Sequence, residues 1–105
     1  MLQAVSNEFS LGSVPLNAVR NFKYTVINTS DKLITINKLT VSCGTCTKAS
    51  MDTAQIPPNG KADVNVIYTP NSTGLNRKRI SIDYNVGTAH VDPCILYFDA
   101  DVKQI

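Results

Sequence analysis

Two short motifs gather the side chains best suited to chemistry. Cys43 and Cys46 form a Cys-x-x-Cys motif, and His90 and Cys94 form a His-x-x-x-Cys motif. The first spacing is typical of redox-active thiols, and both spacings occur among the ligands of tetrahedral zinc. Whether these four side chains can meet depends on the elements that carry them.

The surroundings of the Cys-x-x-Cys motif argue against both chemistries. A redox site of the thioredoxin type needs its first cysteine at a helix N-terminus, yet residues 48–51 carry no helical apolar stripe. For zinc, Cys43 ends one expected strand and Cys94 begins another that runs parallel to it, which separates the pairs by about 15–20 Å. We therefore expect no metal ion, no cofactor and no redox catalysis. Zinc at Cys43, Cys46, His90 and Cys94 stays an open alternative.

The cysteine count bears on the redox state. Three cysteines cannot form a complete disulfide framework. A content of 43% hydrophobic residues suffices for a core that needs no disulfide bonds to fold. We expect reduced thiols, with Cys43 and Cys46 packed beside a tight turn that Gly44 permits. A small disulfide between Cys43 and Cys46 is the alternative.

Apolar residues recur at every second position along the chain. Clear examples are Ala62 to Tyr68, Ile80 to Tyr84 and Leu96 to Val102. The run from Leu33 to Val41 shifts phase between Ile36 and Leu39, which predicts a bulge. Turn residues separate the runs, for example Asn28-Thr29-Ser30 and Ile56-Pro57-Pro58-Asn59-Gly60. The pattern predicts one antiparallel immunoglobulin-like β-sandwich of about seven strands, with a core over residues 7–103 and an N-terminal arm over 1–6.

His90 is the only histidine, so Ser–His–Asp or Cys–His catalysis would depend on it. It lies in an expected loop that continues to Pro93, where an exposed histidine is ordinary. We expect no catalytic residue and no enzymatic activity. The same loop, His90, Val91, Asp92 and Pro93, is a candidate contact for a partner.

Arg77, Lys78 and Arg79 form the one basic cluster. Alternation places Arg77 and Arg79 on the solvent side at the start of a strand, where charge discourages edge-to-edge aggregation. A contact with an acidic partner is the alternative. The segment before Phe9 is a third candidate, because it can add a strand to the sheet edge of a neighbour.

Composition narrows the classes of partner. The chain has 105 residues, a net charge of +2 and 17% charged residues. This charge balance does not favour nucleic acid or an anionic membrane as a partner. No apolar stretch approaches the roughly 20 residues that span a bilayer. The N-terminal residues lack the basic and apolar segments of a signal peptide, which favours a cytoplasmic product or the mature part of a periplasmic or extracellular one.

Several motifs together resemble one group of immunoglobulin-like domains. They are Asn28-Thr29-Ser30, Ser42-Cys43-Gly44-Thr45-Cys46, Ile56-Pro57-Pro58-Asn59-Gly60, Val66-Ile67-Tyr68-Thr69-Pro70 and Gly74. The set is similar to a bacterial domain family of unknown function with a Ser-Cys-Gly-Cys-Thr signature, from which this chain departs by one inserted residue. That family resembles the ASH and major-sperm-protein domains. The resemblance covers about residues 7 to 103, and it implies binding or scaffolding without catalytic residues.

These observations predict a structural or binding protein. The first hypothesis is an auxiliary decoration protein on a bacteriophage capsid, placed at the virion surface and bound to a repeated subunit. The alternative is an exported bacterial module that binds a protein or a carbohydrate. A zinc- or thiol-dependent protein is the third class.

Overall fold

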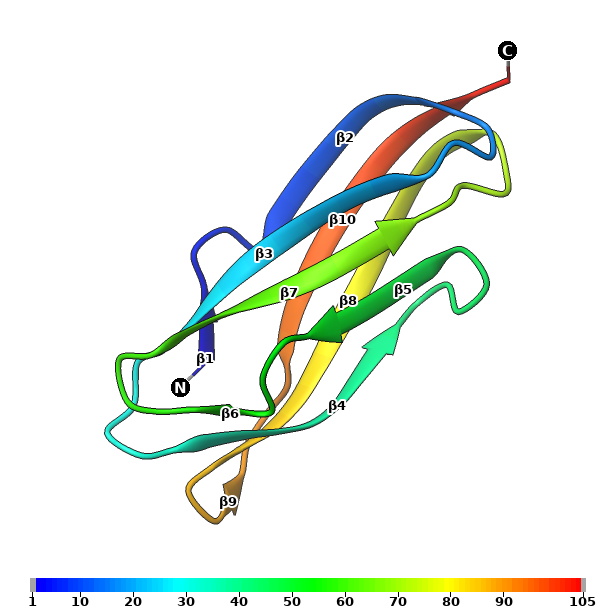
Figure 1. Ribbon diagram of the computed structural model, residues 1–105. Helices are drawn as coiled ribbons and strands as arrows, with labels where there is room; N and C mark the ends of the chain where they lie inside the picture. The colour runs from blue at the N-terminus through cyan, green and yellow to red at the C-terminus, as the bar shows by residue number, and fades with distance from the viewer. Residues whose placement is uncertain (1, 105) are drawn as a thin grey trace.

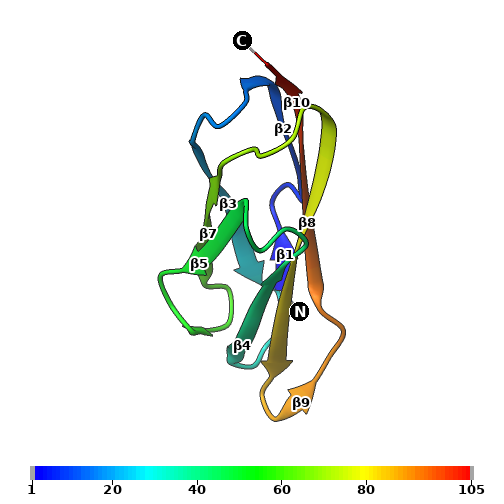
Figure 2. The same ribbon diagram turned by 90° about the vertical axis from the view of Figure 1, so that its right-hand side faces the viewer.

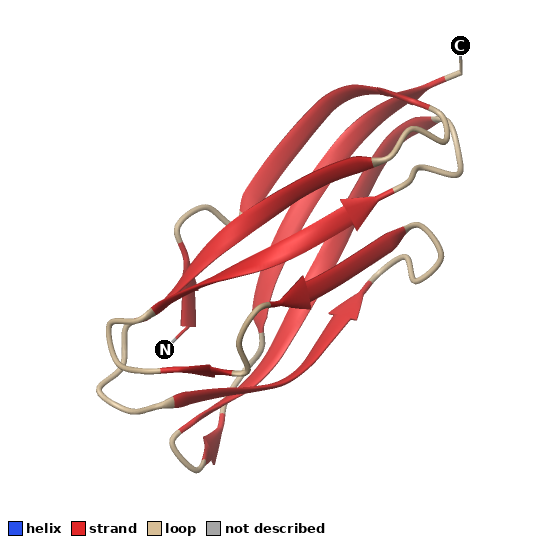
Figure 3. Cartoon of the chain, in the orientation of Figure 1, coloured by secondary structure: helices blue, strands red, loops and turns tan. Residues whose placement is uncertain are grey.

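Strands and connecting turns make up the whole described chain. The computed structural model describes residues 2–104, and Figure 3 shows strands and loops without a helix there. In those residues no helix is long and apolar enough to cross a membrane. The ten strands are β1 (Leu2–Ala4), β2 (Glu8–Pro15), β3 (Arg20–Asn28), β4 (Ile34–Val41), β5 (Thr47–Met51), β6 (Gln55–Ile56), β7 (Lys61–Tyr68), β8 (Gly74–Val86), β9 (Ala89–His90) and β10 (Cys94–Lys103).

The strands form two sheets that pack face to face (Figures 1 and 2). One sheet has four strands in the order β1-β3-β7-β5. The other has six, in the order β2-β10-β8-β4-β6, with β9 paired to β8. The molecule is elongated, with extents of 49 × 20 × 19 Å. The predicted immunoglobulin-like sandwich is confirmed, and seven of the described strands have five residues or more.

The core lies between the sheets and comes from alternate residues. In β7 the predicted inward set is buried, and in β10 the inward residues from Leu96 to Val102 are at most 1% exposed. The phase shift predicted in β4 is a register irregularity between Ile36 and Lys38 opposite β8. Phe98 lies at the centre of the core, with its ring 5.0 Å from that of Phe22 and 5.1 Å from that of Tyr68.

Two expectations about the sheets are wrong. β2 pairs with β10 in parallel, so the sandwich is not wholly antiparallel. These two strands are joined by no hairpin, which is the connection that would impose an antiparallel pairing. The expected N-terminal arm is also a strand, because β1 pairs antiparallel with β3 from Leu2 opposite Asn28. Leu2 is 6% exposed, so this segment completes the chain's own sheet.

Asn28 joins three segments at one end of the sandwich. It is fully buried, and its Nδ2 donates to the carbonyl of Lys32 (2.7 Å) and to that of Ile56 (2.9 Å). Its Oδ1 accepts from the backbone N–H of Ser30 (2.9 Å) and from the Ser30 hydroxyl (2.6 Å). The Asn28-Thr29-Ser30 turn predicted from the sequence is therefore tied to the start of β4 and to β6.

Candidate functional site

The Cys43–Cys46 motif forms the turn that carries the chain from one sheet to the other. β4 ends at Val41, and β5 begins in the opposite sheet at Thr47. The Thr47 N–H donates to the Cys43 carbonyl (3.0 Å), and the Thr69 N–H donates to the Cys46 carbonyl (2.8 Å). The tight turn predicted around Gly44 is therefore present at the end of β4.

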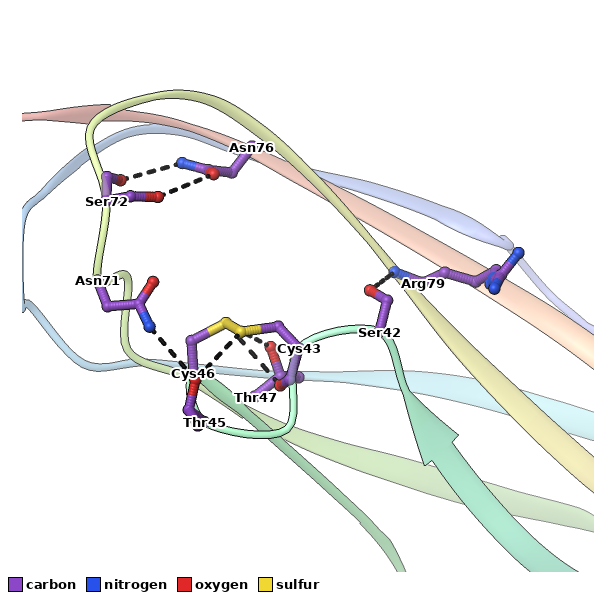
Figure 4. Close-up of a disulfide and its surroundings, with 9 residues drawn as sticks. All are labelled: Ser42, Cys43, Thr45, Cys46, Thr47, Asn71, Ser72, Asn76 and Arg79. Atoms are coloured by element: carbon purple, nitrogen blue, oxygen red, sulfur yellow. Dashed lines mark hydrogen bonds between the residues drawn. A yellow bond between two sulfur atoms is a disulfide. The ribbon is translucent and has the colours of Figure 1, made fainter.

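The two cysteines of this turn form a disulfide, with 2.07 Å between the sulfur atoms (Figure 4). The expectation of reduced thiols is wrong at this pair. The turn brings the two Cα atoms to 5.6 Å, which is within the ordinary range for a disulfide. Asn71 Nδ2 donates to Thr45 Oγ1 (3.4 Å), so the loop after β7 also contacts the disulfide turn.

The four zinc candidates do not come together. Cys94 pairs with Ile82 of β8, and Ile82 pairs with Leu39 of β4, four residues before Cys43. At about 4.8 Å per strand and 3.4 Å per residue, Cys94 lies roughly 17 Å from Cys43. Within residues 2–104 no three His, Cys, Asp or Glu side chains are grouped to hold a metal ion.

His90 lies at the opposite end of the six-stranded sheet. It belongs to β9, which pairs with the end of β8, so it is not in a loop as expected, and Asn85 lies opposite it. Its Nε2 is 2.5 Å from Asp83 Oδ1, and both side chains are well exposed. An exposed pair of this kind contributes little to stability. The segment after it, Val91 to Pro93, has no regular structure and leads into β10.

Cys94 is the one free cysteine in the described part of the chain, and it is half-buried. Burial raises the pKa of its thiol, because the charged thiolate is poorly solvated there. The unfolded chain therefore loses this proton first as the pH rises. The stability linked to Cys94 is complete below the ordinary thiol pKa and is lost as the pH approaches the raised value.

Two results are expected from alkylation with iodoacetamide. The native, unreduced protein should accept one label, at Cys94, and should react more slowly at mildly alkaline pH than the same protein in urea. Cys94→Ser should abolish labelling and reduce the alkaline loss of stability. Three labels on the native protein would contradict the disulfide, and equal rates in the folded and unfolded states would contradict the raised pKa.

Arg77, Lys78 and Arg79 lie inside a strand and not at its start. β8 begins at Gly74, and β10 pairs with it along the whole basic run. Arg77 contacts Glu8 (2.8 Å) and Asp99 (3.9 Å), and its guanidinium carbon lies 4.9 Å from the centre of the Tyr97 ring. The hydrogen bond to Glu8 raises the pKa of Arg77 above its ordinary value.

Lys78 and Arg79 differ from Arg77 in having no ion pair among residues 2–104. Arg79 lies on the outer face of the sheet, and its register partner in β10 is Tyr97. Lys78 is half-buried on the opposite side of the strand. Together with Ser42, Arg77 and Tyr97 they line a hollow of about 280 Å³.

One edge of β8 is unpaired beside this hollow. β4 accompanies β8 only as far as Val41, which lies opposite Ile80. Ser42 extends the contact by one step: its N–H donates to the Arg79 carbonyl, and its Oγ accepts from the Arg79 N–H, both at 2.9 Å. From Gly74 to Lys78, β8 has β10 on one side and, among residues 2–104, no strand on the other. In Figure 1 the yellow start of β8 extends past the arrowhead of β4.

Sequence reasoning found the basic run and missed this edge. Alternation of side chains reports which residues are buried, but it does not report where a neighbouring strand ends. The useful signal was the segment from Gly74 to Arg79, which has one apolar residue, Leu75, and makes the stretch after Pro70 longer than a turn needs.

Solved structures with the same fold come from distant sources. A human CEP192 ASH/PapD-like domain superposes with a TM-score of 0.79 at 6% identity, covering 99% of this chain and 86% of that domain. The Caenorhabditis elegans protein SSP-19, described as an MSP-domain-like family member, superposes with a TM-score of 0.72 at 11% identity, covering 90% of this chain and 94% of that protein. These likenesses support the predicted relation to ASH and major-sperm-protein domains at the level of the fold.

A third structure places the same fold within a longer protein. The Vibrio cholerae VesB protease gives a TM-score of 0.80 at 13% identity, with 95% of this chain covered. The chain spans 31% of that protease. No curated protein matches the chain.

A family model matches residues 2–102, nearly the whole sequence. Its description is "Protein of unknown function (DUF1573)". The two-sheet sandwich and the disulfide turn described above are thus features of a chain that belongs to the DUF1573 family.

Proposed function

We propose that this chain is a non-catalytic module that binds a protein partner and works in an oxidising compartment, as part of an exported bacterial protein. The Cys43–Cys46 disulfide carries this proposal. Disulfides persist in the periplasm and outside the cell, whereas cytoplasmic reductants keep thiols reduced.

The architecture supports binding as the activity. Sheet edges that end without a neighbour offer rows of backbone donors and acceptors to another chain. The β8 edge beside Lys78 and Arg79 is such a row, and it lies next to the disulfide turn. The similar fold in VesB occupies part of a longer protein, which is the arrangement expected of a module.

The second candidate is the decoration protein of a bacteriophage capsid. It is also a non-catalytic binding role, and it predicts a repeated capsid subunit as the partner. The two candidates differ in where the chain is found, since a capsid protein is assembled in the reducing cytoplasm.

Fractionation of the native cells separates the two candidates. The periplasmic and envelope fractions should contain the chain with Cys43 and Cys46 unavailable to alkylation until a reductant is added. Recovery of the chain on sedimenting virus particles, with all three thiols reactive, would replace this proposal with the decoration protein.

A further inference from the structure

We propose that the unpaired edge of β8, from Leu75 to Lys78, binds an acidic peptide in an extended conformation, which adds to the six-stranded sheet as a strand where β4 ends. The proposal rests on the proposed protein-binding function and names the chemistry of the partner. It is carried by two independent observations, the backbone direction along this edge and the charge on both of its faces.

The backbone direction follows from Arg79. Its N–H and its carbonyl both face Ser42, on the side that β4 occupies further along. In an antiparallel ladder the backbone groups alternate between the two sides of a strand, so those of Leu75 and Arg77 face the same side as those of Arg79. Neither residue has a backbone partner there among residues 2–104. Two N–H and two carbonyl groups are therefore available to an added strand.

The side chains at this edge carry positive charge on both faces. Arg79 lies on the outer face, and Lys78 lies on the inner side, and neither has an acidic partner in the described structure. In an added strand, successive side chains also alternate between the two faces. Two consecutive acidic residues opposite Arg77 and Lys78 would therefore place one carboxylate on the outer face, diagonal to Arg79, and the other on the inner side beside Lys78.

The hollow next to the edge gives this partner room. It is lined by both free cations, by Ser42 and by Tyr97, whose ring already lies under the Arg77 guanidinium. Glu8 and Asp99 hold Arg77 on the side away from β4, which leaves Lys78 and Arg79 as the cations of this hollow that are free for a ligand. Leu75, which is 80% exposed, offers an apolar contact at the far end of the same edge.

The disulfide turn explains why this edge is open. After Ser42 the chain turns away from β8 and crosses to the other sheet, where the Cys46 carbonyl accepts from Thr69. The disulfide closes this crossing within four residues, so the chain cannot continue along β8. The edge is thus built into the fold next to a covalently fixed turn.

A protective role for the same charges makes a different prediction. Lysines on an exposed edge prevent strands of other chains from pairing with it. If protection were their only role, removing the charge would increase pairing of any extended peptide. If they recognise a ligand, removing the charge weakens the binding of an acidic peptide.

The test uses capped hexapeptides of alternating valine and threonine with a central Glu-Glu pair, and a matched peptide with Gln-Gln. Titration of the ¹⁵N-labelled protein should shift the backbone amides of Leu75 and Arg77 and should slow their hydrogen exchange. The double variant Lys78→Glu, Arg79→Glu should lower the affinity for the Glu-Glu peptide by about tenfold or more. The native protein should bind the Gln-Gln peptide about tenfold less tightly than the Glu-Glu peptide. N-methylation of both glutamates should abolish binding, since the N–H of one of the two faces β8 and is a ladder donor.

Arg20→Glu is the matched control, because Arg20 is an exposed arginine on the other sheet with no ion pair in the described residues. It should leave the affinity unchanged. Equal binding of the Glu-Glu and Gln-Gln peptides would overturn the acidic chemistry. Shifts confined to other strands would overturn this site and leave a binding module that works elsewhere. Concentration-dependent shifts at Leu75 and Arg77 without peptide would assign the edge to a second copy of the chain and overturn the proposal.

Discussion

Replacing Phe98 with alanine is expected to lower the free energy of unfolding by about 3–5 kcal/mol. Phe98 is 1% exposed and lies on β10, an interior strand of the six-stranded sheet between β2 and β8. Its ring meets Phe22 and Tyr68 of the opposite sheet edge to face. The substitution therefore removes contacts that hold the two sheets together and leaves a cavity between them. Urea unfolding followed by circular dichroism measures the loss.

Phe9 provides the control for Phe98. It stacks on Phe22 with ring centres 4.9 Å apart, but it is 40% exposed. Phe9→Ala should cost less than about 2 kcal/mol, because much of this ring already contacts water. Since a small domain has only about 5–15 kcal/mol of stability, Phe98→Leu serves as a milder variant that stays folded. Equal losses for Phe98→Ala and Phe9→Ala would contradict the central position of Phe98.

Asn28→Ala is expected to lower the free energy of unfolding by about 2–4 kcal/mol. Four side-chain hydrogen bonds are lost, and the buried carbonyl of Ile56 loses a donor in a place that water does not reach easily. The same unfolding measurement applies, together with hydrogen exchange at β6 and at the start of β4, which should accelerate.

Asn71→Ala is the matched control for Asn28→Ala. Asn71 also lies in a turn, but it is exposed and its side chain makes one bond of 3.4 Å, to Thr45. We expect Asn71→Ala to change the free energy of unfolding by no more than about 0.5 kcal/mol. If both asparagine variants lost the same stability, the buried network around Asn28 would not be the cause.

Side-chain alternation was sufficient to predict the central strands. β7 and β10 alternate strictly because one face of each packs against the core, and the phase shift of the Leu33–Val41 run correctly predicted the irregularity in β4. β5 was not predicted. It is an edge strand in which Ala49 and Met51 are only half-buried, so its sequence lacks the strong apolar period of a central strand. β1 has three residues, too few to show a period.

The candidate site was predictable only in part. The basic residues and the Cys-x-x-Cys turn are visible in the sequence, and the separation of Cys43 from Cys94 followed from the parallel course of their strands. The disulfide did not follow, because it depends on how closely the turn brings Cys43 to Cys46. The open edge did not follow either, because it depends on the backbone partners of Leu75 and Arg77, which side-chain types do not encode.

The position of β10 in its sheet has a consequence for synthesis of the chain on the ribosome. β10 is made after both β2 and β8, and it pairs with β2 on one side and β8 on the other. Until residue 103 has left the exit tunnel, β2 has no neighbour among the described strands of its sheet. β8 then lacks β10 from Gly74 to Ile82, and β4 pairs with it only from Ile80 to Val86. The nascent chain must therefore wait for β10 before the two halves of this sheet can join, and a ribosome that stalls before residue 103 would leave both strand edges exposed to other chains.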